Sequence, residues 1–242
     1  MKKKATKVIS IILLMLPMIA AAHFVAFPEE SRCMLIRFAD FEKTGNIYFR
    51  ENTTPEKITK LQAIENEARK KVTAFWQKEL LLDYEIIYCN NENDFDQYGH
   101  AGAPAATQLK CGAYIVLKEE SLDRDILAHE MSHTVLYRNI GWYRSVFKIP
   151  TWFNEGLAMQ VDERDYYSID SLLAKRNKGL VLPDITKLNK AQDFFAGNHE
   201  AVMLNYSTAK YIVHEWLKTH SLERFIQEIK NGKSFEAAYK QE

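Results

Sequence analysis

Apolar residues recur at three- and four-residue steps in several stretches of the chain, which is the spacing of one face of a helix. The longest stretch follows Thr54 and Pro55, a typical cap and first-turn pair, and its apolar face extends to Leu80. The same spacing predicts four further helices. They open at Ser121 and Asp123, at Pro150, ahead of Ala209, and at Leu222.

Runs of β-branched and aromatic residues predict three strands, at residues 46–50, 84–89 and 113–117. A short helical turn is expected at 94–98, and the segment 99–106, rich in Gly, Ala and Pro, is typical of a loop. The strands come first and the helices cluster afterwards. This order favours an α+β fold, with a small mixed or antiparallel sheet near the N-terminus followed by a helical C-terminal part.

The first 22 residues have the composition of an export signal. Four lysines precede a mostly apolar stretch that starts at Val8 and ends in the small residues Ala20, Ala21 and Ala22. We therefore expect a signal peptide at 1–22. An uncleaved N-terminal membrane anchor is the alternative, because apolar residues resume just after the alanines and could reach spanning length.

The rest of the chain is expected to comprise an N-terminal extension at 23–45 and one domain at 46–242. The extension is either a permanent part of the protein or a propeptide that blocks the cleft before activation. Whether the signal is cleaved or kept, the body is predicted to lie outside the cytoplasm. It would be periplasmic, secreted, or attached to the membrane by its N-terminal segment.

The chain holds 242 residues, 47% of them hydrophobic, which is enough for one well-buried core. Its 32 Lys and Arg balance 32 Asp and Glu, so losing the four lysines of a signal peptide changes the net charge from 0 to −4. A mildly acidic chain without a basic stripe argues against nucleic acid as a partner. The sequence leaves the oligomeric state open.

Three cysteines are compatible with an oxidising compartment, namely Cys33, Cys89 and Cys111. A disulfide between Cys89 and Cys111 that leaves Cys33 unpaired and a set of three unpaired thiols both agree with the sequence. No Cys-x-x-Cys pair occurs in the sequence, which excludes a zinc knuckle built on thiolates.

The candidate chemistry begins at the motif His129-Glu130-Met131-Ser132-His133, within a predicted helix. At about 3.6 residues per turn, His129 and His133 project from one face about one turn apart, so both rings can bind the same ion. Glu130 lies about 100° round the helix, where it can reach a water molecule activated by that ion without binding the ion itself. Imidazole and carboxylate ligands suit Zn²⁺, and we expect one ion per chain.

A catalytic zinc ion typically has three protein ligands and one open position. The third candidate ligand is Glu155, 22 positions after His133, in the sequence Trp-Phe-Asn-Glu-Gly-Leu-Ala at the start of the next predicted helix. An unpaired carboxylate in such an apolar setting would be costly to bury, and coordination to a metal removes that cost. His129, His133 and Glu155 are therefore the predicted metal site.

The two motifs, HEMSH at 129–133 and PTWFNEGLA at 150–158, resemble those of the gluzincin metallopeptidases. The resemblance is strongest to the peptidase MA-like family of bacterial proteins, in which His-Glu-x-x-His is followed on a later helix by Asn/Asp-Glu-Gly-Leu-Ala. It covers about residues 46–217 and includes a strand of the type seen at 113–117, ahead of the first zinc helix.

The resemblance implies a zincin-like fold and an exported zinc metallopeptidase that hydrolyses peptides or proteins. The three predicted ligands would bind zinc, and Glu130 would act as general base when water attacks a peptide carbonyl. Gluzincins commonly add a tyrosine or a histidine that stabilises the oxyanion. The candidate here is Tyr206, expected near the start of the penultimate helix, with Tyr211 as the alternative.

Family architecture also implies that the strand at 113–117 forms the edge of the sheet and holds an extended substrate by strand addition. The sequence departs from thermolysin-like members at Met159, where those proteins have an aspartate that steadies a ligand histidine. Asp162 lies about two turns beyond Glu155 and is expected to be too distant to take the role of that aspartate. The groups that orient the ligands are therefore unassigned.

Two other functions are compatible with the sequence. One is a zinc hydrolase that acts on a non-peptide amide or ester, and the other is a non-catalytic envelope protein that uses the fold to bind a partner. His214 and His220 are not expected to form a second metal site, because their rings are roughly 120° apart round the helix. Four aromatic residues are expected to pack in the core: Trp142, Tyr143, Trp152 and Phe153.

Overall fold

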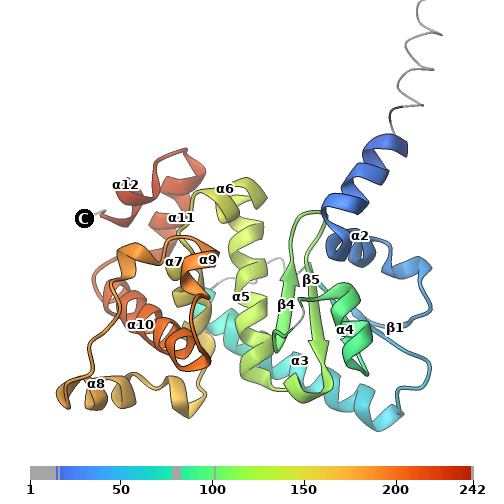
Figure 1. The fold of residues 1–242 in the computed structure, drawn as a ribbon, viewed down its shortest axis with the longest axis horizontal. Coiled ribbons are helices and arrows are strands. Elements are labelled where there is room, and N and C mark those ends of the chain that lie inside the picture. The colour runs from blue at the N-terminus through green and yellow to red at the C-terminus, as the bar shows by residue number, and fades with distance from the viewer. Residues whose placement is uncertain (1–14, 16, 78–82, 101, 241–242) are drawn as a thin grey trace, which may run out of the picture. The chain divides into compact units, whose positions relative to one another are not determined.

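The computed structural model describes residues 15, 17–77, 83–100 and 102–240 (Figure 1). These residues form an α+β fold with one five-stranded mixed sheet near the N-terminus, followed by helices, which confirms the predicted fold class. The chain divides into two compact units. Unit 1 contains the described residues up to Thr53 together with Glu85–Glu119, and unit 2 contains those within 54–84 and 120–242.

Unit 1 is built on the sheet, whose strand order is β1-β2-β3-β5-β4. β2, β3 and β5 run parallel to one another, whereas β1 and β4 are antiparallel to their neighbours. The three predicted strands are confirmed as β2, β3 and β5. The bounds are β1 (Glu42–Thr44), β2 (Ile47–Phe49), β3 (Glu85–Cys89), β4 (Ala105–Gln108) and β5 (Tyr114–Lys118), and helix α4 (Glu92–Tyr98) follows β3.

Two expectations about the sheet are wrong. The segment 99–106 does not stay a loop to its end, because Ala105 and Ala106 begin β4. This strand pairs with β5, with Ala106 opposite Val116, so β5 lies inside the sheet and β4 takes the edge. Alanine has a low strand propensity, and β4 forms because the apolar strand β5 beside it supplies the packing.

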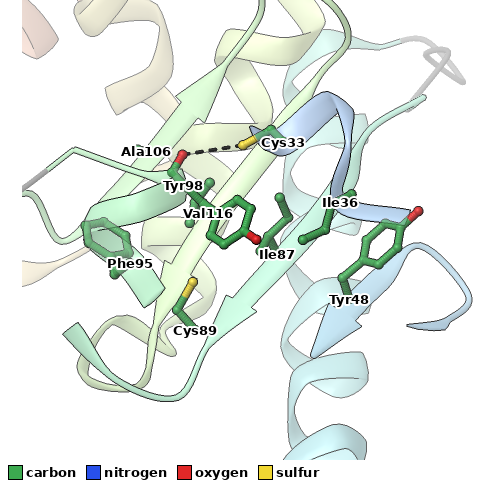
Figure 2. Close-up of a cluster of buried hydrophobic side chains, with 9 residues drawn as sticks. All are labelled: Cys33, Ile36, Tyr48, Ile87, Cys89, Phe95, Tyr98, Ala106 and Val116. Carbon is green, nitrogen blue, oxygen red and sulfur yellow. Dashed lines mark hydrogen bonds between the residues drawn. The ribbon is translucent and has the colours of Figure 1, made fainter. Parts of the chain in front are cut away.

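The N-terminal extension is part of the core of unit 1. Its helix α2 (Pro28–Met34) and the 3₁₀ turn η1 (Ile36–Phe38) bury Cys33 and Ile36 in one cluster with Ile87 (Figure 2). The Cys33 thiol also donates a hydrogen bond to the carbonyl of Tyr98, at 3.4 Å. This part of the extension therefore contributes to the buried core of unit 1.

The three cysteines are unpaired, so the disulfide between Cys89 and Cys111 is absent. Cys89 is buried in the same cluster as Cys33, whereas Cys111 is exposed. Burial raises the pKa of the Cys33 thiol well above its usual value and that of Cys89 to about 12. Two of the thiols are therefore kept neutral inside unit 1.

Unit 2 consists of helices joined by short turns (Figure 1). The side chain of Thr54 caps the first helix by accepting from the Lys57 amide at 3.4 Å, as predicted, while Leu80 lies outside the described residues. No helix among the described residues is both long and apolar enough to cross a bilayer. The helices are α3 (Pro55–Trp76), α5 (Arg124–Ile140), α6 (Trp142–Phe147), α7 (Thr151–Ala158), α8 (Ile169–Asn177), α9 (Ala191–Phe194), α10 (His199–Leu217), α11 (Leu222–Lys230) and α12 (Phe235–Tyr239).

The aromatic residues near the second motif differ in burial. Trp152 and Phe153 are buried as predicted, and the Phe153 ring packs against Trp216 with a centroid distance of 5.3 Å. Tyr143 is 58% exposed, so its expected burial is wrong. It lies on the short helix α6, whose buried residue is Ser145, so Tyr143 falls on the outward side of that helix.

Candidate metal centre

Helix α5 carries both histidines of the first motif into the interior of unit 2. Its N-terminus is fixed by Asp123, whose side chain accepts from the backbone amides of Asp125 and Ile126 at 2.7 and 3.2 Å. Further along, Leu127 and Met131 are fully buried. The motif therefore lies on a packed helix rather than on a solvated turn, as the apolar residues around it predict.

Helix α7 supplies Glu155 and is held close to α10 by the next residue, Gly156. A Cβ atom at this glycine would lie 2.6 Å from Val213 Cγ2 and 2.7 Å from the carbonyl oxygen of Ala209. The absence of a side chain therefore allows the two helices to pack at a distance that no other residue permits. This close packing explains the glycine of the second motif and leaves Glu155 only 8% exposed.

The three predicted ligands meet at one point. His129 Nε2 lies 3.2 Å from His133 Nε2, and Glu155 Oε2 lies 3.2 Å from the first nitrogen and 3.5 Å from the second. A tetrahedral ion with ligand bonds of about 2.0–2.1 Å holds its ligand atoms roughly 3.3 Å apart. The cluster could therefore hold a metal ion, and it is the one such group found among the described residues.

The chemistry of the donor atoms also fits a cation. Glu155 Oε2 is buried and makes no hydrogen bond within the described part of the chain. Two imidazole nitrogens that face each other at 3.2 Å cannot both be satisfied as acceptors. A buried carboxylate oxygen and two buried lone pairs are costly to leave without a partner, and a bound cation removes that cost.

Ionisation of the cluster reflects the same need for positive charge. Burial by itself lowers the pKa of His133, but the charges of Glu155 and Glu130 outweigh it and raise this pKa to about 9. Burial likewise acts to raise the pKa of Glu155, but the two histidines lower it to about 2. Both shifts favour positive charge beside the Glu155 carboxylate.

Asn154 orients one of the ligands and was not identified from the sequence. Its side-chain oxygen lies 3.1 Å from His133 Nδ1. Because an amide oxygen only accepts hydrogen bonds, Nδ1 carries a hydrogen and Nε2 faces the cluster. The signal was present in the second motif, where the asparagine directly precedes Glu155 and so lies on a neighbouring part of the same helix.

Among the described residues, Asp162 pairs with Arg164 rather than with a ligand histidine. It is fully buried after the 3₁₀ turn η3 (Met159–Val161), and it accepts a hydrogen bond from Arg164 Nε at 3.0 Å. Burial acts to raise the pKa of Asp162, but Arg164 and then His129 lower it. His129 Nδ1 has no hydrogen-bond partner among the described residues, so the group that orients this histidine is unassigned.

Tyr206 lies beside the cluster, with its ring centroid 5.9 Å from that of His129. Burial, with smaller contributions from the charges of Glu155 and Glu130, raises the pKa of Tyr206 well above its usual value. Its hydroxyl group is therefore a stable hydrogen-bond donor. Tyr211, the alternative, has no ring contact with either histidine among the described residues.

The position of Tyr206 within its helix differs from the prediction. Helix α10 begins at His199, so Tyr206 lies inside the helix rather than at its start. Rings from other elements of unit 2 flank it, with centroid distances of 5.9 Å to Tyr167 and 5.1 Å to Phe194. This aromatic packing fixes the ring next to the candidate site.

The remaining histidines of interest stay outside the cluster, as predicted. His214 is exposed, and His220 stacks on Trp216 with a centroid distance of 5.0 Å and an interplanar angle of 12°. His100 and His199 are exposed as well.

Comparison of the chain with protein-family models gives no match, and comparison with curated proteins gives none either. The assignment of a function therefore depends on the residues and on their geometry.

Proposed function

We propose that this chain is an exported zinc-dependent metallopeptidase. The observation that carries the proposal is the convergence of His129 Nε2, His133 Nε2 and Glu155 Oε2 at 3.2–3.5 Å from one another. Two imidazoles and one carboxylate form a typical protein ligand set for a catalytic zinc ion that keeps a position open. The resemblance of both motifs to those of the gluzincin peptidases supports the same assignment.

The proton chemistry is assigned to Glu130. Bound zinc would polarise a substrate carbonyl and increase the acidity of a water molecule. Glu130 is half-buried, and its charge contributes to the raised pKa values of both His133 and Tyr206, which supports this assignment. Its carboxylate would accept a proton from the attacking water and then deliver that proton to the leaving amine.

Tyr206 is assigned the role of stabilising the negative charge that develops on the carbonyl oxygen of the substrate. Its raised pKa keeps the phenol protonated at neutral pH, so it can donate a hydrogen bond to that oxygen. A donor of this kind typically contributes on the order of 10²-fold or more to the rate. The choice of a peptide as substrate depends on the resemblance alone, because the predicted substrate strand at 113–117 is not the edge of the sheet.

Metal content is the first test. The chain without residues 1–22 is purified and its metal is measured by elemental analysis, beside the variants His129→Ala and Glu155→Ala. We expect about one zinc ion per chain, lost in both variants. The matched control is His214→Ala, an exposed histidine on α10, which should keep the metal. An intact protein that takes up no zinc, even after reconstitution, would contradict the proposal.

Hydrolysis is the second test, with Glu130→Gln as the matched variant. We expect this variant to keep its zinc and to cleave peptides about 10²–10⁴-fold more slowly. A panel of peptides set against small amides and esters separates a peptidase from a hydrolase of another class. A protein whose biological role survives Glu130→Gln unchanged would be a partner-binding protein rather than an enzyme.

A further inference from the structure

A second feature, independent of the metal site, lies in the N-terminal part of unit 1. Residues 24–38 expose a succession of apolar side chains where a water-facing segment would have polar ones. The exposed fractions are 41% for Phe24, 83% for Val25, 40% for Met34, 41% for Leu35 and 74% for Phe38.

The same segment is apolar on its inner side as well. Cys33 and Ile36 are at most 1% exposed and belong to the buried cluster of unit 1 (Figure 2), while Leu35 and Phe38 beside them point outward. A helix at the surface of a soluble protein has one apolar face, turned to the core, and one polar face. At the end of α2 and in η1, apolar side chains face outward as well as inward, and the outward ones fit an apolar medium.

Basic side chains accompany the exposed rings. The Arg37 guanidinium lies 4.8 Å from the centroid of Phe38, and that of Arg32 lies 5.9 Å from the centroid of Phe24. Glu29, in the first turn of α2, is half-buried rather than exposed. Aromatic and aliphatic residues with neighbouring arginines are typical of segments that lie in the interface of a lipid bilayer.

The position of the segment in the chain indicates which apolar medium it meets. It directly follows the lysines and the apolar stretch of residues 1–22, a sequence that is predicted to enter the membrane during export. We propose that residues 24–38 form a membrane-contact surface, with Phe24, Val25, Leu35 and Phe38 inserted among the lipids at the bilayer interface. This surface remains on the protein after cleavage of the predicted signal and would hold unit 1 at the membrane.

The test uses the chain that starts at His23, so that the export segment itself cannot bind lipid. Residues 17–22 are exposed throughout, and their removal takes away no buried side chain. Binding is measured by co-sedimentation with vesicles of phosphatidylglycerol and phosphatidylethanolamine, and in parallel with phosphatidylcholine vesicles. We expect the double variant Leu35→Ser/Phe38→Ser to lower the partition coefficient by about tenfold or more.

The matched control removes two apolar side chains of similar exposure from unit 2. Val181 is 83% exposed and Phe147 is 61% exposed, so Val181→Ser/Phe147→Ser should leave vesicle binding unchanged. Circular dichroism and thermal unfolding confirm that both double variants fold. Equal losses in the two double variants, or no vesicle binding by the unchanged chain, would overturn the proposal.

Self-association is the competing explanation, and the same variants address it. Sedimentation velocity without lipid shows whether the chain from His23 dimerises and whether Leu35→Ser/Phe38→Ser abolishes the dimer. A monomer that binds vesicles through this surface supports the proposal. A dimer that depends on Leu35 and Phe38 and does not bind vesicles would assign the surface to a second copy of the chain instead.

Discussion

The interiors of the two units differ in what they bury. The core of unit 1 is mainly apolar, with Ile87, Val116 and Phe95 fully buried around the sheet, and its buried carboxylate Asp94 is paired with Arg50. The interior of unit 2 buries the polar or charged side chains of His129, which is 7% exposed, and Glu155, which is 8% exposed. Burial of apolar side chains stabilises the core of unit 1. Burial of polar and charged side chains in unit 2 carries a desolvation cost, which is typical of functional sites.

Polar groups in unit 2 also hold the backbone that bears the site. Lys210 on α10 donates to the carbonyl of Asp162, and Gln160 donates both to the carbonyl of Gly156 at 2.8 Å and to that of Lys210 at 3.0 Å. Burial lowers the pKa of Lys210. These bonds join α7 and η3 to α10, so the polarity of this interior fixes the helices whose side chains form the cluster.

The greatest loss of stability is expected from a substitution in the core of unit 1. Ile87→Ala removes a fully buried side chain from the central strand β3 and should cost about 2–5 kcal/mol of stability. Urea unfolding measures the change, and Val181→Ala, at an 83% exposed position, should stay within about 0.5 kcal/mol. Zinc stoichiometry in the folded fraction should be unchanged, and a loss of zinc would break the distinction between the units.

The next effect tests the close packing in unit 2. Gly156→Ala forces a methyl group against Val213 and the carbonyl of Ala209, so we expect a loss of about 1–3 kcal/mol, measured by thermal unfolding. The double variant Gly156→Ala/Val213→Ala should recover only part of the loss, because the backbone contact remains. Full recovery would show that side-chain crowding alone sets the distance between α7 and α10.

A smaller effect is expected for the residue that orients His133. Asn154→Ala removes the acceptor for Nδ1 and should weaken zinc binding about 10–100-fold, measured by competition with a chelator. Asn154→Asp keeps an acceptor at the same place and should retain most of the affinity. If Asn154→Ala binds zinc as tightly as the unchanged chain, the hydrogen bond has no orienting role.

The pH dependence follows from the raised pKa of His133. Zinc must displace a proton from this ring, so the affinity should rise about tenfold per pH unit until the pH reaches its pKa of about 9. In the metal-free chain the protonated ring contributes stability that is fully present below its ordinary pKa of 6.5 and is lost as the pH rises through about 9. Calorimetric titration at several pH values measures the slope, and an affinity that does not change with pH would contradict this assignment.

The smallest effect concerns the thiols of unit 1. Only Cys111 is exposed, so one thiol should react with a thiol reagent in the native chain and all three in denaturant. Cys111→Ser should change the stability by less than about 0.5 kcal/mol. Rapid reaction of Cys33 or Cys89 in the native protein would show that the apolar core of unit 1 opens readily.

Local patterns in the sequence predicted most of unit 2. Helix starts follow from caps such as Thr54 and Asp123, whose bonds reach only two or three residues along the chain. The metal cluster is also partly local, because His129 and His133 are one helical turn apart. Glu155 is a more distant partner and was found through its motif.

The errors fall where distant segments decide the structure. β4 was missed because its alanines have a low strand propensity and its pairing with β5 is a tertiary contact. The cysteine pairing was left open for the same reason, since spacing in the sequence does not show that Cys89 faces the core and Cys111 faces water.

All candidate site residues belong to one continuous stretch of the chain, 120–242, within unit 2. No ligand, orienting group or proton carrier comes from the sheet. Substitutions in unit 1 therefore change none of the candidate ligands. The two short motifs on α5 and α7 carry the whole ligand set between His129 and Glu155, so one contiguous part of the chain encodes the chemistry of the candidate site.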